Sequence, residues 1–208
     1  MNMRRKNLLL LLRSSVVILV ASISVVMAVD KDKAKFAPGP ASSFASKQTN
    51  DGVTIGAEAY ETEDMAKTAF GKLNPYAHGV LPVLVVIQND SKETISLEKM
   101  KVEYETTDRE RIGPTTARDV QYLNPVKRPN LNGTPLPGMG GRHKNPLASP
   151  EIEARAFAAR MLPPGESAYG FFYFQTGHRS GAKLYLTGLK QAGSGKDLFY
   201  FEMPLGIH

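Results

Sequence analysis

The side chains that could bind a metal or move a proton are few and lie far apart in the sequence. The histidines are His78, His143, His178 and His208, no two of them lie within one helical turn, and the chain has no Cys. A metal-dependent or hydrolytic enzyme would therefore need His143 and His178 to meet in the fold, together with a carboxylate such as Asp119. We expect instead that the histidines are exposed to solvent, that the protein holds no metal or cofactor, and that it is not an enzyme.

Paired carboxylates offer a second possible chemistry. Glu103 and Glu105 share one face of a predicted strand, about 7 Å apart, and two acids at such a distance can hydrolyse glycosides. Lys99 and Lys101 lie on the same face. We therefore expect a solvated charged surface rather than a reaction centre.

The N-terminal segment predicts export. Residues 1–7 contain Arg4, Arg5 and Lys6, an apolar stretch follows, and Val26-Met27-Ala28 is typical of a cleavage site. We expect a signal peptide over residues 1–28 and an extracytoplasmic protein, periplasmic or secreted. The alternative is an uncleaved anchor in the inner membrane, because residues 8–29 are long enough to span a bilayer. Only in that case do we expect contact with a membrane.

The charge of the exported part is close to neutral. The whole chain has 26 Lys and Arg against 20 Asp and Glu, a net charge of +6. Four of the basic residues lie in residues 1–28, so removal of that segment leaves 22 against 20. Because a nucleic-acid-binding domain needs a concentrated basic face, we expect no nucleic acid partner.

Alternating apolar residues predict strands along most of the exported part. Residues 29–51 are polar and small, which is typical of a flexible linker. Residues 80–87 are apolar on both faces, so we expect both faces of this strand to be covered. Helices are expected over 63–71 and from Ser149 to about residue 162. The remaining predicted strands are residues 52–60, 99–105, 168–174, 183–189 and 198–203.

Two short motifs suggest a fold. A hydrophobic strand ends in Asn89-Asp90-Ser91, and Pro163-Pro164-Gly165-Glu166 precedes the aromatic strand Gly170-Phe171-Phe172-Tyr173-Phe174. This pattern resembles the immunoglobulin-like, telokin-like domains of secreted bacterial proteins of unknown function. The resemblance implies an all-β fold, an immunoglobulin-like antiparallel sandwich over residues 52–205, and an extracytoplasmic setting, with no catalytic residues. We expect an insertion at 120–162 that holds one helix and a long Pro/Gly loop.

The loop over residues 124–148 is the unusual segment of the chain. It contains five Pro and four Gly, and residues 120–150 include no acid. Its candidate binding residues are Lys127, Arg128, Arg142, His143 and Lys144. Clustered cations attract anionic surfaces, so the loop could bind an anionic envelope surface or an acidic envelope protein. The alternative is a solvated insertion without a partner.

These observations favour a non-catalytic secreted domain that binds another component of the cell envelope. An exposed apolar patch around Phe172 and Phe174 would support a protein partner. The alternative is a carrier of a small ligand or glycan, which would need a pocket lined by residues such as Tyr169, Tyr173 and Tyr185.

Overall fold

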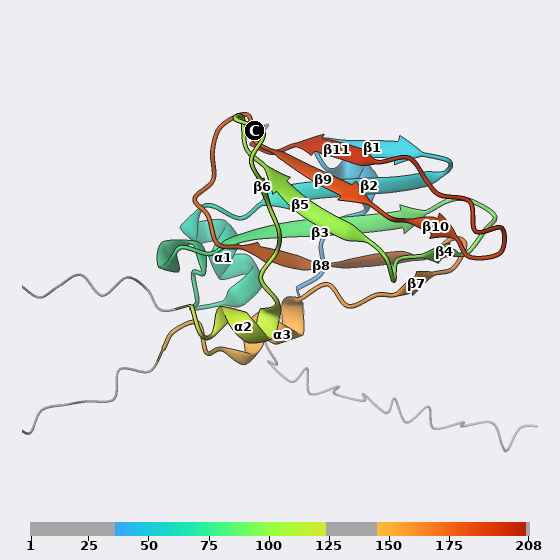
Figure 1. The fold of residues 1–208 in the computed structure, drawn as a ribbon. Helices are drawn as coiled ribbons and strands as arrows, with labels where there is room; N and C mark the ends of the chain where they lie inside the picture. The colour runs from blue at the N-terminus through green and yellow to red at the C-terminus, as the bar shows by residue number, and fades with distance from the viewer. Residues whose placement is uncertain (1–35, 124–144, 207–208) are drawn as a thin grey trace, which may run out of the picture. The chain divides into compact units, whose positions relative to one another are not determined.

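The protein is mostly β-structure, with antiparallel sheets and a few short helices (Figure 1). The computed structural model describes residues 36–123 and 145–206. Sheet A has the order β1-β2-β3-β8, sheet B the order β10-β4-β7, and sheet C the order β11-β9-β5-β6. No helix within these described ranges is long and apolar enough to cross a membrane.

The bounds of the elements follow. Sheet A consists of β1 (Ser46–Asn50), β2 (Val53–Ala59), β3 (Leu81–Asn89) and β8 (Ser167–Phe174). Sheet B consists of β4 (Ile95–Ser96), β7 (Met161–Leu162) and β10 (Lys190–Gln191). Sheet C consists of β5 (Lys101–Glu105), β6 (Arg111–Ile112), β9 (Lys183–Thr187) and β11 (Phe201–Pro204). The helices are α1 (Glu63–Phe70), α2 (Ala117–Val120) and α3 (Pro150–Arg155), with 3-10 turns η1 (Ala41–Ser43) and η2 (Tyr76–His78).

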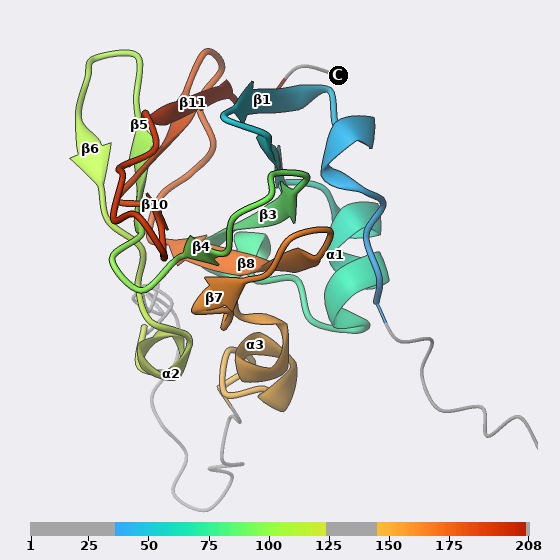
Figure 2. The same cartoon turned by 90° about the vertical axis from the view of Figure 1, so that its right-hand side faces the viewer.

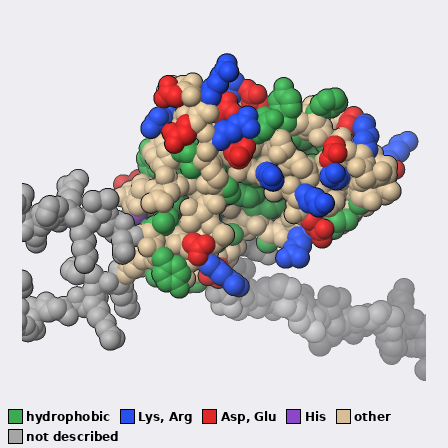
Figure 3. Space-filling model, in the orientation of Figure 1, with side chains coloured by type: hydrophobic (Ala, Val, Ile, Leu, Met, Phe, Trp, Pro, Cys, Tyr) green, Lys and Arg blue, Asp and Glu red, His purple; other side chains and the backbone are tan. Residues whose placement is uncertain are grey.

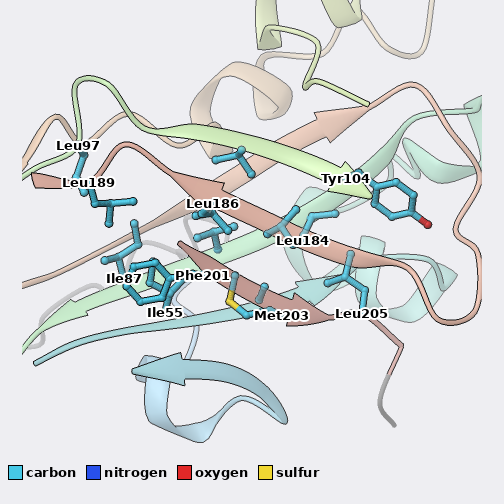
Figure 4. Close-up of a cluster of buried hydrophobic side chains, with 14 of the residues drawn as sticks. Ile55, Ile87, Leu97, Tyr104, Leu184, Leu186, Leu189, Phe201, Met203 and Leu205 are labelled. Carbon is cyan, nitrogen blue, oxygen red and sulfur yellow. The ribbon is translucent and has the colours of Figure 1, made fainter. Parts of the chain in front are cut away.

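Sheets A and C share one hydrophobic core. Ile55 of β2 and Ile87 of β3 lie in the same buried cluster as Tyr104 of β5, Leu184 of β9 and Phe201 of β11 (Figure 4). Each strand contributes alternate residues to this cluster, because successive side chains of a strand point to opposite faces. Burial of each large apolar side chain contributes about 1.5–3 kcal/mol. The predicted antiparallel β-architecture is therefore confirmed at the level of its sheets.

The other face of sheet A carries a second core. Leu84 and Val86 of β3, with Phe171 of β8, are buried there against residues of the helices, such as Phe70 and Ile152. Figure 2 shows α1 and α3 beside sheet A, on the side away from β5 and β11. This second layer explains the apolar run in residues 80–87, and the prediction that both faces of that strand are covered is confirmed.

The linker expected over residues 29–51 is wrong for its described part. Phe36 is buried beside Tyr60 and Phe171, and β1 pairs with β2 along its whole length. Gly56 leaves room for this segment, because a Cβ there would lie 2.8 Å from the carbonyl oxygen of Ala41. The polar composition of this segment suggested a linker, but a strand at the edge of a sheet needs few apolar residues.

The helix expected from Ser149 to about residue 162 is also shorter than predicted. It ends at Arg155, and the chain continues as a non-helical segment into β7. The Phe157 N–H donates to the Phe171 carbonyl oxygen (3.1 Å), and Gly170 makes this approach possible because a Cβ there would overlap the Phe157 backbone. A contact distant in sequence therefore overrides the local helical pattern.

The strand expected at 198–203 begins only at Phe201, and Phe199 is 75% exposed. Met203 pairs with Leu184 and is fully buried, as the alternation of this strand predicts. The pattern therefore identified the buried face of β11 but placed the start of the strand too early.

The two turn motifs of the sequence meet in space. The Gly165 N–H donates to the Asn89 carbonyl oxygen (2.7 Å), and the Asn89 N–H donates to the Glu166 carbonyl oxygen (3.0 Å). The buried Asn89 side chain donates from Nδ2 to the carbonyl oxygens of Glu93 (2.8 Å) and Leu162 (2.9 Å). Its Oδ1 accepts from the N–H and the hydroxyl of Ser91. Asn89 therefore joins the end of β3 to β7 and to the turn before β8.

Candidate functional site

The predicted basic loop lies outside the described residues. Lys127, Arg128, Arg142, His143 and Lys144 fall within residues 124–144, so their role in binding an anionic partner stays a prediction. The described remainder of the predicted insertion, residues 120–123 and 145–162, contains the last residue of α2, all of α3 and the segment leading into β7.

The His178 side chain is buried, contrary to the expectation that it is exposed to solvent. Only 5% of its side chain is exposed, and its Nδ1 lies 3.3 Å from the Tyr104 hydroxyl. Its Nε2 lies 4.0 Å from Oε2 of Glu61, and its backbone N–H donates to the Tyr76 hydroxyl (3.2 Å). In the described part of the chain, no three His, Asp or Glu side chains are placed to hold a metal ion.

The arrangement around Tyr104 indicates a structural role for this cluster. The Tyr104 oxygen accepts from the Arg179 N–H (2.9 Å), so the Tyr104 proton is available to Nδ1 of His178. Burial raises the pKa of Tyr104, which keeps the phenol protonated. The cluster joins β5 to the loop after β8 and to the connection between β2 and α1.

Removing the Tyr104 hydroxyl is expected to destabilise the fold without unfolding it. Tyr104→Phe leaves the Arg179 N–H without its acceptor, so we expect the free energy of unfolding to fall by about 2 kcal/mol. Tyr200→Phe is the matched control, because the Tyr200 side chain is exposed, and it should change stability by less than about 0.5 kcal/mol. Urea denaturation of the variants measures both values. Equal stability of the two variants would contradict this role.

An open groove lies near the two sheets. Its volume is about 650 Å³; Leu97, Glu98 and Met100 form one wall, residues 157–160 the other, and Phe172 contributes to the floor. This volume lies within the range of small-molecule ligand pockets. The rings of Phe157 and Phe172 are stacked, with centroids 5.3 Å apart. Both rings are half-buried, so an apolar surface remains open to a ligand.

The groove lies on the side where sheets A and C are not joined along their edges. On the opposite side β1 approaches β11, where the Gln48 side chain accepts from the Glu202 N–H (2.7 Å) and the Asn50 side chain donates to the Tyr200 carbonyl oxygen (3.1 Å). On the groove side, β8 is contacted by Thr115, whose N–H donates to the Tyr173 carbonyl oxygen (2.7 Å), and by the segment that begins at Phe157. The groove opens on this side of β8, between the segment that begins at Phe157 and the residues before β5.

One basic group without an acidic partner lies at this groove. Arg160 is part of its wall and forms no ion pair within the described ranges, whereas Lys101 lies on the strand face opposite Met100 and does not line the groove. Glu98 is the acid in the lining. By contrast, several other cations of sheets B and C are paired: Arg111 with Glu105, Lys190 with Asp197, and Lys196 with Asp51. Figure 3 shows a recessed hydrophobic area with Lys and Arg side chains beside it.

The aromatic residues singled out in the sequence are separated by the fold. Phe174 is fully buried, while Phe172 is half-buried in the groove. Tyr173 is buried and its hydroxyl donates to the Ile152 carbonyl oxygen (2.7 Å), so it cannot line an open pocket. Tyr169 bonds the Phe36 carbonyl oxygen, and Tyr185 lies beneath Arg111, 4.2 Å from the guanidinium carbon. The three tyrosines therefore do not form a common binding site.

Sequence reasoning missed the residues that line the groove. Phe157 and Ala158 fall within the helix expected from Ser149 to about residue 162, and Met100 falls within the strand expected at 99–105. No local signal marks residues 157–160 as a groove wall, because their conformation depends on the hydrogen bond to Phe171. The aromatic pair Phe157 and Phe172 becomes informative only when the ends of α3 and β8 are known.

Comparisons with known proteins give structural likenesses alone. No protein-family model matches the chain, and no curated protein matches its sequence. The yjhA protein from Bacillus subtilis is similar in structure, with a TM-score of 0.40 and 10% identity over 78% of this chain and 98% of that chain. The ycdA protein from Bacillus subtilis subsp. subtilis str. 168 has a TM-score of 0.38 and 12% identity, over 76% of this chain and 38% of that chain. A functionally unknown protein from Listeria monocytogenes EGD-e has a TM-score of 0.33 and 10% identity, over 78% of this chain and 82% of that chain.

Proposed function

We propose that the chain is an exported, non-catalytic interaction domain that binds another component of the cell envelope in the groove between residues 97–100 and 157–160. The observation that carries the proposal is the combination of the stacked Phe157 and Phe172 with Arg160, a cation of the groove wall that has no acidic partner in the described ranges. Exposed aromatic surface in a concave site is stabilised by an apolar ligand group, and the arginine favours an anionic one.

We infer the setting and the finer fold from the sequence together with the packing. The basic and apolar composition of residues 1–28 supports export, with cleavage or with retention as an anchor. Two sheets that share a core and approach each other at β1 and β11 support an immunoglobulin-like sandwich with an inserted helix. Mass spectrometry of the N-terminus of the exported protein distinguishes cleavage after Ala28 from retention.

Photo-crosslinking in the envelope tests the binding site. A photoreactive residue at Ala158, which is exposed in the groove wall, is expected to form a discrete adduct with an envelope component. The same residue at Lys72, which is exposed after α1, is the matched control and should form none. Adding Phe172→Ala to the Ala158 probe should reduce the adduct several-fold while the circular dichroism spectrum stays unchanged.

The adduct yields at Ala158 and Lys72 distinguish binding in the groove from non-specific contact. Adducts of equal yield at Ala158 and Lys72 would show contact that does not depend on the groove, and would contradict it. An adduct at Ala158 that survives Phe172→Ala would contradict the part assigned to the aromatic floor.

A further inference from the structure

We infer that the occupant of the groove is an extended polypeptide segment in which apolar and acidic side chains alternate, and that it adds as a strand along residues 157–160. This inference rests on the proposed function and names the partner chemistry of the same site. Three independent observations support it: an open backbone, an apolar floor and an arginine in the wall, Arg160, without an ion-pair partner among the described residues.

The backbone of residues 157–160 is fixed at both ends and open between them. The Phe157 N–H donates to the Phe171 carbonyl oxygen (3.1 Å), and the Arg160 carbonyl oxygen accepts from the Leu97 N–H (2.7 Å). Between these bonds, the N–H groups of Ala158, Ala159 and Arg160 have no hydrogen-bond partner among the residues that the structure describes, nor do the carbonyl oxygens of Phe157, Ala158 and Ala159. Such a segment offers donors and acceptors in the order that an added strand uses.

The side chains of this segment favour close approach by another backbone. Ala158 and Ala159 are small, and Ala158 is exposed. In Figure 1 the segment runs from α3 to β7 along the outside of β8. Because both ends are held by hydrogen bonds, the segment is already ordered before a partner binds, which lowers the entropic cost of association.

The floor of the groove favours an apolar side chain of the partner. Phe157 and Phe172 present stacked, half-buried rings, and Met100 is half-buried in the opposite wall. Methionine adapts its shape to different apolar groups and interacts favourably with aromatic rings. We therefore expect one leucine, isoleucine or phenylalanine of the partner to occupy this position.

The unpaired Arg160 in the groove wall favours an acidic neighbour for that apolar side chain. Arg160 forms no ion pair with Glu98, the acid of the same lining, or with any other described acid. In an added strand, successive side chains point to opposite sides, so acids would flank the apolar anchor. A fatty acid shares the apolar and anionic chemistry, but it has no amide groups for the open backbone, and this favours the polypeptide.

Fluorescence anisotropy with a labelled heptapeptide tests the inference on the exported protein. The probe alternates aspartate with leucine or phenylalanine and is blocked at both ends. We expect saturable binding that Arg160→Glu weakens by about tenfold or more, because it reverses a charge in the wall. Lys72→Glu, a reversal at an exposed site away from the groove, should leave the affinity unchanged within about twofold.

Two altered ligands separate the contributions of backbone and charge. A probe with N-methyl groups on alternate amides keeps its side chains but loses the strand hydrogen bonds, and we expect its affinity to fall by about tenfold. A probe with lysine in place of aspartate should not bind measurably. Binding that survives N-methylation would contradict the inference that the partner adds as a strand. Binding of dodecanoate without binding of the peptide would contradict the inference that the partner is a polypeptide. If the Ala158 adduct persists while the heptapeptide fails, the proposed function stands and the inferred partner chemistry is wrong.

Discussion

Asn89→Ala is expected to lower the free energy of unfolding by about 3 kcal/mol or more. The Asn89 side chain is fully buried, and its Nδ2 donates to the carbonyl oxygens of Glu93 and Leu162 while its Oδ1 accepts two hydrogen bonds from Ser91. Each bond contributes about 0.5–1.5 kcal/mol, and each buried group left without a partner costs about 1–3 kcal/mol. The loss should also loosen β7, because Leu162 belongs to that strand.

Two other substitutions separate the parts of this effect. Asn50→Ala removes a side chain that is only half-buried and bonds the Tyr200 carbonyl oxygen, so it should cost less than about 1 kcal/mol. Asn89→Asp keeps an acceptor for Ser91 but places a carboxylate against two carbonyl oxygens, and it should be at least as destabilising as alanine. Urea denaturation followed by circular dichroism measures all three values. Similar stability of the Asn89→Ala and Asn50→Ala variants would contradict the role of Asn89.

Phe171→Ala is expected to lower the free energy of unfolding by about 3–5 kcal/mol. The Phe171 ring is buried in the second core, with ring centroids 4.8 Å from those of Tyr60 and Phe70 and 5.6 Å from that of Phe36. Its removal leaves a cavity bordered by β8, α1 and the segment before β1. The same cavity should increase hydrogen exchange in α1 before it does so in β9, because β9 belongs to the other core.

Phe199→Ala is the matched control for Phe171→Ala. Phe199 is 75% exposed, so its truncation should change stability by less than about 0.5 kcal/mol. Thermal and urea unfolding measure the difference between the two variants. A Phe171→Ala protein as stable as the Phe199→Ala protein would show that the helical layer contributes little to the fold.

The strands of sheets A and C could be predicted from the sequence because their burial follows the alternation of residues. Val102 and Tyr104 are buried between exposed or half-buried charged residues, and the apolar run of β3 corresponds to cores on both of its faces. Helix α1 was predictable from its ends, since Thr62 caps its start and Gly71 ends it with a positive φ of 69°, which glycine adopts readily.

The end of α3 could not be predicted, because residues 154–161 carry an apolar spacing that suits a helix. Phe157 instead bonds the backbone of β8, and Gly170 gives the space that this contact requires. The same limit applies to the segment before β1, where Phe36 is buried by an aromatic cluster that forms only after folding.

The groove could not be predicted because its walls are far apart in the sequence. Residues 97–100 and 157–160 come together only when β4 pairs with β7 and Leu97 bonds Arg160. The burial of the His178 side chain could not be predicted either, because it depends on Tyr104 and Glu61, which are distant in the sequence. Composition identified cations in the chain but not which of them lack acidic partners.

The most direct test of the central claim is nuclear magnetic resonance of the nitrogen-15-labelled exported protein during titration with the alternating acidic heptapeptide. We predict that the largest amide shifts occur at Ala158, Ala159 and Arg160, with smaller shifts at Met100, and that Phe172→Ala reduces them. Shifts centred instead on the outer face of sheet C around Tyr185, or spread evenly over the surface, would contradict the assignment of the groove as the binding site.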